Sequence, residues 1–152
     1  MKLLITMHRD EDGVFIGECP SIRGIKDSSG SLDLLRALTT SLPGAIRLVG
    51  SDSALPQALQ ERICDGVVSG VAGAVPELIL PLFENGATLD RCAVERLDAF
   101  VQALDAFPVP WGLKWIAESR GLAPAHFPLP LSERRMLEGR RLQQWFREWW
   151  GA

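Results

Sequence analysis

The alternation of short apolar strands with helices between residues 20 and 86 most constrains the fold of this chain. Strands are predicted at residues 22–26, 46–49 and 66–69, and small or glycine-rich residues follow each of them. Helical periodicity then resumes, for example over residues 32–41 and 76–83. Strands separated by helices run parallel, because each helix returns the chain to the same end of the sheet. The sequence therefore predicts an α/β fold.

A β-hairpin is predicted ahead of these units. Residues 2–7 and 14–18 are short segments rich in strand-forming residues, and a polar stretch containing Asp12-Gly13 separates them. Glycine accepts the positive φ that a tight hairpin turn requires. Residues 1–19 are therefore predicted to form a hairpin, and residues 20–86 the strand and helix units.

The remainder, residues 87–152, is predicted to be helical. Apolar residues recur there at steps of three and four, which places them on one stripe of a helix. The stripe consists of Leu89, Ala93, Leu97, Phe100, Leu104 and Phe107. Two further helices are expected, one ending near Gly121 and one running from Ser132 to about Trp149. Three tryptophans in the last helix are expected to pack on the body of the protein or on a second subunit rather than on a cofactor.

Charge and cysteine content exclude several classes of protein. The formal net charge of -3 argues against a nucleic-acid binder, since phosphate contacts require clustered basic residues. No apolar run approaches the roughly 20 residues of a membrane helix, and the first residues are too polar for a signal peptide. Cys19, Cys64 and Cys92 are too far apart to suggest a zinc site or a disulfide framework. A cytoplasmic protein without a membrane or nucleic-acid partner is expected.

Lys26 is the candidate for chemistry, because it ends the first predicted strand of the alternating region. In α/β folds, ligands and catalytic side chains gather at the carboxyl ends of the strands. An amine in that place suggests reaction with a carbonyl group. Position alone leaves the alternative of an ordinary solvated lysine.

Three sequence phrases resemble the last three strands of the dihydrodipicolinate synthase and N-acetylneuraminate lyase family. They are GIKDSSG at residues 24–30, LVGSDS at 48–53 and DGVVSGVAGAVPEL at 65–78. The similarity continues through the prolines at 108 and 110, Lys114 and the LPLS phrase at 129–132, so that it covers residues 20–148. It implies a partial (β/α)8 TIM barrel of three strand-helix units, with the N-terminal β-hairpin and the C-terminal helical region added.

The same resemblance implies class I aldolase chemistry. Lys26 matches the lysine that forms a Schiff base with the keto group of pyruvate or a related 2-keto acid, and this reaction requires a neutral amine. Gly50 and Val68 are implied to lie around the bound pyruvate. Ser28, in the loop after the lysine, is expected to donate a hydrogen bond to the substrate or to serve only as a small turn residue. No cofactor is implied, and the lyases of this family suggest a homo-oligomer.

Two departures from the family pattern reduce the activity that we expect. The first five strand-helix units of the family have no counterpart here, and the chain contains no tyrosine to act as the family's proton shuttle. We therefore expect a truncated member with little or no turnover alone. Three parallel strands would also leave open sheet edges. Either the hairpin pairs with the Lys26 strand, or two chains associate.

A shorter resemblance supports an alternative function. Residues 8–20, HRDEDGVFIGECP, are similar to the first hairpin of HicB-like antitoxins. This similarity implies a non-catalytic interaction protein whose partner is a small toxin. A decayed gene fragment without a function of its own is the third alternative.

Overall fold

The structure is a computed structural model of the chain, and it describes residues 6–9, 15–19, 24–84 and 89–151. The strands are β1 (Thr6–Arg9), β2 (Phe15–Cys19), β3 (Gly24–Asp27), β4 (Ile46–Val49) and β5 (Gly66–Val67). The helices are α1 (Leu32–Ser41), α2 (Leu55–Gln60), α3 (Gly70–Ala74), the 3-10 helix η1 (Pro76–Leu78), α4 (Pro81–Glu84), α5 (Arg91–Leu104), α6 (Trp111–Ser119) and α7 (Glu133–Gly151). The predicted α/β class is confirmed.

The strands form one sheet of five in the order β1-β2-β3-β4-β5. β3, β4 and β5 run parallel, whereas β1 pairs antiparallel with β2 and β2 antiparallel with β3. The hairpin therefore pairs with the Lys26 strand, which was the first of the two predicted solutions to the open edge. The Asp12-Gly13 turn lies outside the described residues.

The first two helices cover the parallel strands with apolar side chains. Leu35 of α1, Val49 of β4 and Leu55 of α2 are each at most 1% exposed and belong to one core. Ser31 caps α1, because its hydroxyl accepts a hydrogen bond from the Leu34 N–H at 3.3 Å. The predicted helix over Leu32–Ser41 is confirmed.

The segment after β5 differs from the prediction. The strand predicted over residues 66–69 ends at Val67, because the Ser69 hydroxyl caps α3 by accepting the Ala72 N–H at 2.8 Å. The single helix predicted over residues 76–83 is also wrong, since η1 and α4 are separate there. Pro81 has no N–H to donate to a preceding turn, so a continuous helix is unfavourable at that point.

The helical region is held together by an aromatic cluster. Phe100 of α5 is fully buried, and its ring lies 6.4 Å from that of Trp145 and 5.9 Å from that of Trp149, both on α7. The Arg96 guanidinium of α5 lies 5.6 Å from the centre of the Trp150 ring, and that of Arg120 lies 5.3 Å from it. The three tryptophans therefore pack on the body of the protein, as one of the two predictions stated.

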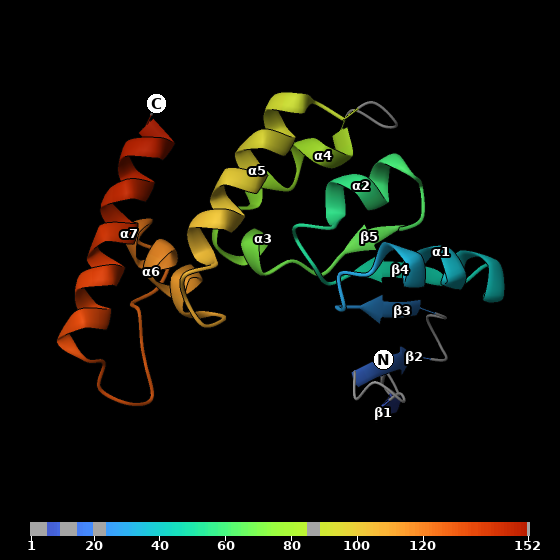
Figure 1. Cartoon of the computed structure of the whole chain (residues 1–152), viewed down its shortest axis with the longest axis horizontal. Helices are drawn as coiled ribbons and strands as arrows, with labels where there is room; N and C mark the ends of the chain where they lie inside the picture. The colour runs from blue at the N-terminus through green and yellow to red at the C-terminus, as the bar shows by residue number, and fades with distance from the viewer. Residues whose placement is uncertain (1–5, 10–14, 20–23, 85–88, 152) are drawn as a thin grey trace.

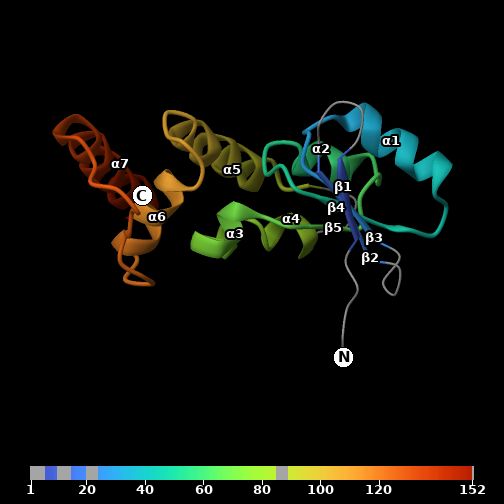
Figure 2. The ribbon, with the colours of Figure 1, turned by 90° about the horizontal axis from the view of Figure 1, so that it is seen from below.

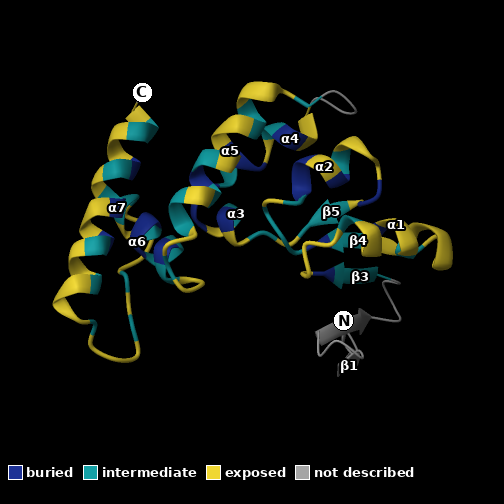
Figure 3. Cartoon of the chain, in the orientation of Figure 1, coloured by how far each residue is buried: buried dark blue, intermediate teal, exposed yellow. Residues whose placement is uncertain are grey.

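The elements are arranged along one long axis. Figures 1 and 2 show the strands with α1 and α2 at one end, α6 and α7 at the other, and α3, α4 and α5 between them. Figure 3 shows buried positions on α3, α5 and α6 and exposed positions along the outer side of α7. Arg120, directly after α6, links α6 to α3 and η1. Its guanidinium donates hydrogen bonds to the Ala74 carbonyl at 2.6 Å and to the Glu77 carboxylate. Within the described ranges, every helix is too short or too polar to cross a membrane.

Candidate functional site

The site begins with the register of the parallel strands. Lys26 of β3 lies opposite Leu48 of β4, and Leu48 lies opposite Gly66 of β5. Side chains of successive strand residues point to opposite faces, so Lys26 and Leu48 share one face and Val49 lies on the other, core-forming face. Lys26 is half-buried, and it comes one residue before the end of β3. The predicted position at a strand's carboxyl end is therefore observed.

The amine of Lys26 is held at a defined place. Its Nζ donates a hydrogen bond to the Ser28 Oγ at 2.5 Å. Both groups converge on Gly50, which follows β4. A Cβ at position 50 would lie 2.2 Å from the Ser28 Oγ and 2.8 Å from the Lys26 Nζ. Only glycine leaves this space free, so three of the four predicted site residues meet at one point.

The fourth predicted residue, Val68, lies just beyond β5 and is 48% exposed. Its N–H donates to the Val49 carbonyl at 2.8 Å, which continues the pairing of β4 with β5 past the last strand residue. Val68 is two residues after Gly66, so it lies on the face that carries Lys26. Its predicted contact with a bound substrate stays a prediction.

Two aspartates at the same ends of the strands were missed from the sequence. Asp27 is 5% exposed, and its Oδ1 accepts the Ser29 N–H at 2.9 Å. Asp52 follows β4, and its Oδ2 accepts the Val71 N–H at 3.2 Å. Among the described residues, the second oxygen of each carboxylate has no hydrogen-bond partner. Their places directly after predicted strands were the signal that could have identified them.

Two other carboxylates, those of Asp65 and Glu77, accept hydrogen bonds from arginines. Hydrogen bonds from Arg47 hold the pKa of Asp65 below its ordinary value, and those from Arg120 do the same for Glu77. A lowered pKa keeps each carboxyl group ionised at neutral pH, so neither can act there as a general acid. In the part of the chain that the structure describes, no three potential metal ligands gather.

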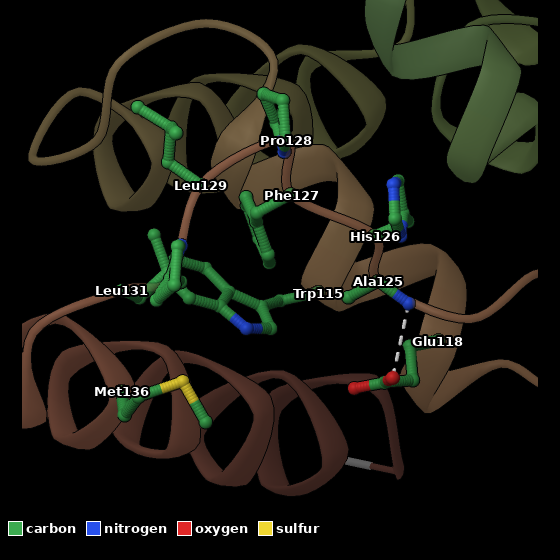
Figure 4. Close-up of a pocket in the computed structure, with 10 residues that line it drawn as sticks. Trp115, Glu118, Ala125, His126, Phe127, Pro128, Leu129, Leu131 and Met136 are labelled. Atoms are coloured by element: carbon green, nitrogen blue, oxygen red, sulfur yellow. Dashed lines mark hydrogen bonds between the residues drawn. The ribbon is translucent and has the colours of Figure 1, made fainter.

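A hollow of about 450 Å³ lies in the helical region, where the loop between α6 and α7 packs over both helices (Figure 4). Trp115, Phe127, Leu131 and Met136 give it an apolar lining. The Glu118 carboxylate at its rim accepts the Ala125 N–H at 3.0 Å and the Gln143 amide at 2.8 Å. Both oxygens of Glu118 therefore accept hydrogen bonds within the chain, and His126 also lines the hollow. The reactive candidate is Lys26.

Gly50→Ala provides a direct test of this geometry. The added methyl group must displace the Ser28 hydroxyl or the Lys26 amine, so we expect the reactivity of Lys26 toward a 2-keto acid to fall by about 10-fold or more. The measurement is the rate of reductive trapping by mass spectrometry. Gly73→Ala is the matched control, because a Cβ there meets nothing within 4 Å. Equal rates in the two variants would show that Gly50 is not part of the site.

Fold and site together define an α/β protein with a lysine amine exposed at the end of a parallel strand. Comparison with known proteins identifies the relatives. The 4-hydroxy-tetrahydrodipicolinate synthase of Thioalkalivibrio sulfidiphilus is 32% identical over 137 residues, which cover 86% of this chain and 46% of that protein. The synthase of Porphyromonas gingivalis is 28% identical over 113 residues, which cover 69% of this chain and 37% of that protein. No family model matches the chain.

Solved structures agree with these relatives. The crystal structure of KD(P)GA from T. tenax has a TM-score of 0.66 at 25% identity, covering 83% of this chain and 47% of that one. Dihydrodipicolinate synthase from Aquifex aeolicus has a TM-score of 0.71 at 22% identity, covering 87% and 46%. The chain is thus a relative of the dihydrodipicolinate synthase-like lyases, and the predicted resemblance is confirmed. It spans less than half the length of the two synthases reported above.

Proposed function

We propose that Lys26 forms a Schiff base with the keto group of pyruvate or a related 2-keto acid. The observation that carries this proposal is the position of the amine, 2.5 Å from the Ser28 hydroxyl and above the unsubstituted Cα of Gly50. The names of the curated relatives support the same chemistry, because those reported above are 4-hydroxy-tetrahydrodipicolinate synthases. The reaction type is that of a class I aldolase.

The proposed step uses the neutral amine as the nucleophile. The Lys26 nitrogen attacks the keto carbon, a carbinolamine forms, and loss of water leaves a protonated imine. Gly50 lets the keto acid approach the nitrogen, while Val68 supplies an apolar wall on the same sheet face. In this proposal the three parallel strands correspond to the last three strand-helix units of a (β/α)8 barrel.

We further propose that this chain alone has little aldol turnover. Carbon–carbon bond cleavage requires proton transfer at the substrate, and the chain contains no tyrosine to supply a phenol. Among the described residues, the hydroxyl that contacts the amine is that of Ser28. The proposal includes a homo-oligomer in the cytoplasm, as expected from the sequence.

The test is reductive trapping. The protein is incubated with pyruvate and borohydride, and the adduct is located by peptide mass spectrometry. The chain has three lysines, at positions 2, 26 and 114, so Lys2 and Lys114 report non-specific reaction within the same sample. We expect the adduct on Lys26 and, in a parallel sample, much less reaction with acetone, which lacks the carboxylate. Equal labelling of the three lysines, or none, would contradict the proposal.

The relatives do not favour the alternative of a non-catalytic, antitoxin-like protein. Its motivation was the sequence of residues 8–20, part of which lies outside the described residues. The described part of the hairpin pairs with another strand of the same chain. In the backbone register, Glu18 lies opposite Ile25 and Cys19 opposite Gly24 of β3. A role in completing the sheet is therefore the interpretation that we adopt for the hairpin.

A further inference from the structure

We propose that Ser28 is the positioning residue of the Lys26 amine and relays a proton during imine formation. This inference rests on the proposed function and gives Ser28 a role different from the substrate contact that the sequence suggested. Three observations carry it: the contact between the two side chains, the rigid loop that presents the hydroxyl, and the arrangement of the other hydroxyls at the same edge of the sheet.

The contact between Lys26 and Ser28 is a short hydrogen bond. Ser28 lies two residues after Lys26, and its Oγ accepts a hydrogen bond from Nζ at 2.5 Å. A lysine side chain has many rotamers, and this bond selects the one that brings the nitrogen within 2.8 Å of the Cβ position of Gly50. The amine is therefore held at the mouth of the strand and does not extend freely into water.

The loop that carries Ser28 is braced on both sides of the hydroxyl. The buried Asp27 carboxylate accepts the Ser29 N–H at 2.9 Å, and the Asp27 carbonyl accepts the Gly50 N–H at 2.6 Å. On the other side, the Ser29 hydroxyl accepts the Ser31 N–H at 3.1 Å. Gly30 has a φ of +76°, a conformation that glycine adopts without strain. This bracing connects β3 to the start of α1 and sets the position of Ser28.

The neighbouring hydroxyls are arranged differently. Ser51 and Ser53, in the loop after β4, form a hydrogen bond with each other at 3.0 Å. Ser28 is the residue whose hydroxyl contacts the amine in the described structure, and the chain has no tyrosine. For a proton that leaves the nitrogen during the reaction, Ser28 is therefore the acceptor in direct contact among the described residues.

The proton transfers proposed for Ser28 leave its hydroxyl unchanged at the end of carbinolamine formation. Attack of the neutral amine forms the N–C bond and leaves a positive nitrogen and a negative oxygen. The Ser28 Oγ accepts the proton from nitrogen and gives its own proton to that oxygen, so the neutral carbinolamine forms and the serine is unchanged. A proton from solvent then converts the hydroxyl into leaving water, while the nitrogen lone pair forms the C=N bond. Such assisted proton transfers contribute factors of about 100 to 10,000.

The first experiment measures the rate of pyruvate trapping at Lys26 over a range of pyruvate concentrations. For Ser28→Ala we expect the rate at saturating pyruvate to fall by about 100-fold, the low end of assisted proton transfer. The half-saturating concentration should stay unchanged. Ser28→Thr, which restores a hydroxyl, should recover most of the rate. Ser53→Ala is the matched control and should react like the natural chain. A change in the half-saturating concentration alone would overturn the inference in favour of a substrate contact.

The second experiment does not require a 2-keto acid site. Formaldehyde with cyanoborohydride methylates lysines through an imine, and Lys114 provides an internal reference because its Nζ bonds to the His126 carbonyl at 2.7 Å. We expect the ratio of Lys26 to Lys114 methylation to fall by several-fold in Ser28→Ala and to recover in Ser28→Thr. An unchanged ratio would overturn the role of Ser28, whereas failure of pyruvate trapping in the natural chain would overturn the proposed function.

Discussion

Lys26→Arg is expected to abolish the pyruvate adduct while leaving the fold intact. Arginine keeps the positive charge and a long side chain, but its guanidinium stays protonated and does not form a Schiff base under these conditions. Because Lys26 is half-buried on the open face of the sheet, we expect the free energy of unfolding to change by less than about 1 kcal/mol. The measurement is the total mass shift after borohydride trapping, together with urea unfolding.

Lys114→Arg is the matched control for this variant. It removes an amine from α6, far along the chain from β3, and should leave the adduct yield unchanged. Persistence of most of the adduct in Lys26→Arg would mean that trapping occurs at other amines. The proposal of a Schiff-base lysine would then fail, whatever the outcome with Ser28.

Phe100→Ala is expected to lower the free energy of unfolding by about 3–5 kcal/mol, the range measured for large aromatic residues in protein cores. Phe100 is 0% exposed, and its ring packs against those of Trp145 and Trp149 on α7 and against Phe146. Removing the ring leaves a cavity between α5 and α7 that these large side chains cannot fill without leaving their rotamers. Urea unfolding followed by circular dichroism provides the measurement.

Phe83→Ala serves as the comparison, because the same side chain on α4 is 40% exposed. Its loss should cost clearly less than that of Phe100, because less apolar surface is buried at that position. Similar losses from the two variants would mean that the aromatic cluster does not hold α5 and α7 together. The yield of the pyruvate adduct on Lys26 in Phe100→Ala also tests whether the sheet that carries Lys26 depends on the packing of α5 against α7.

The sequence predicted the elements whose signals are local. The apolar stripe that includes Leu97 and Phe100 predicted α5, and the short segment Ile46–Val49 predicted β4. Both elements are present in the structure. No helix was predicted before residue 76, yet Gly70–Ala74 is helical because Ser69 caps it and Val71 and Ala74 are buried in the core. Tertiary burial overrode the low helix propensity of glycine there.

The candidate site was predictable in part. Lys26 and Gly50 follow from the sequence phrases that carry the family resemblance, and the structure brings their atoms together. Pairing of the hairpin with β3 was one of two alternatives, because strand order depends on contacts that the periodicity of a strand does not encode. The braces around Ser28 were not predicted, since an aspartate or serine in a loop has many potential backbone partners.

The place of β3 in the middle of the sheet has a consequence for local motion. With β2 on one side and β4 on the other, the lysine strand cannot detach unless one of these neighbours also separates. Amide hydrogens in such strands exchange with solvent only through larger openings, whereas those of an edge strand exchange through fraying. The Lys26 amine therefore projects from one of the slower-opening segments of the sheet. We expect the backbone of β3 to stay paired while the outer hairpin strand β1 opens and closes.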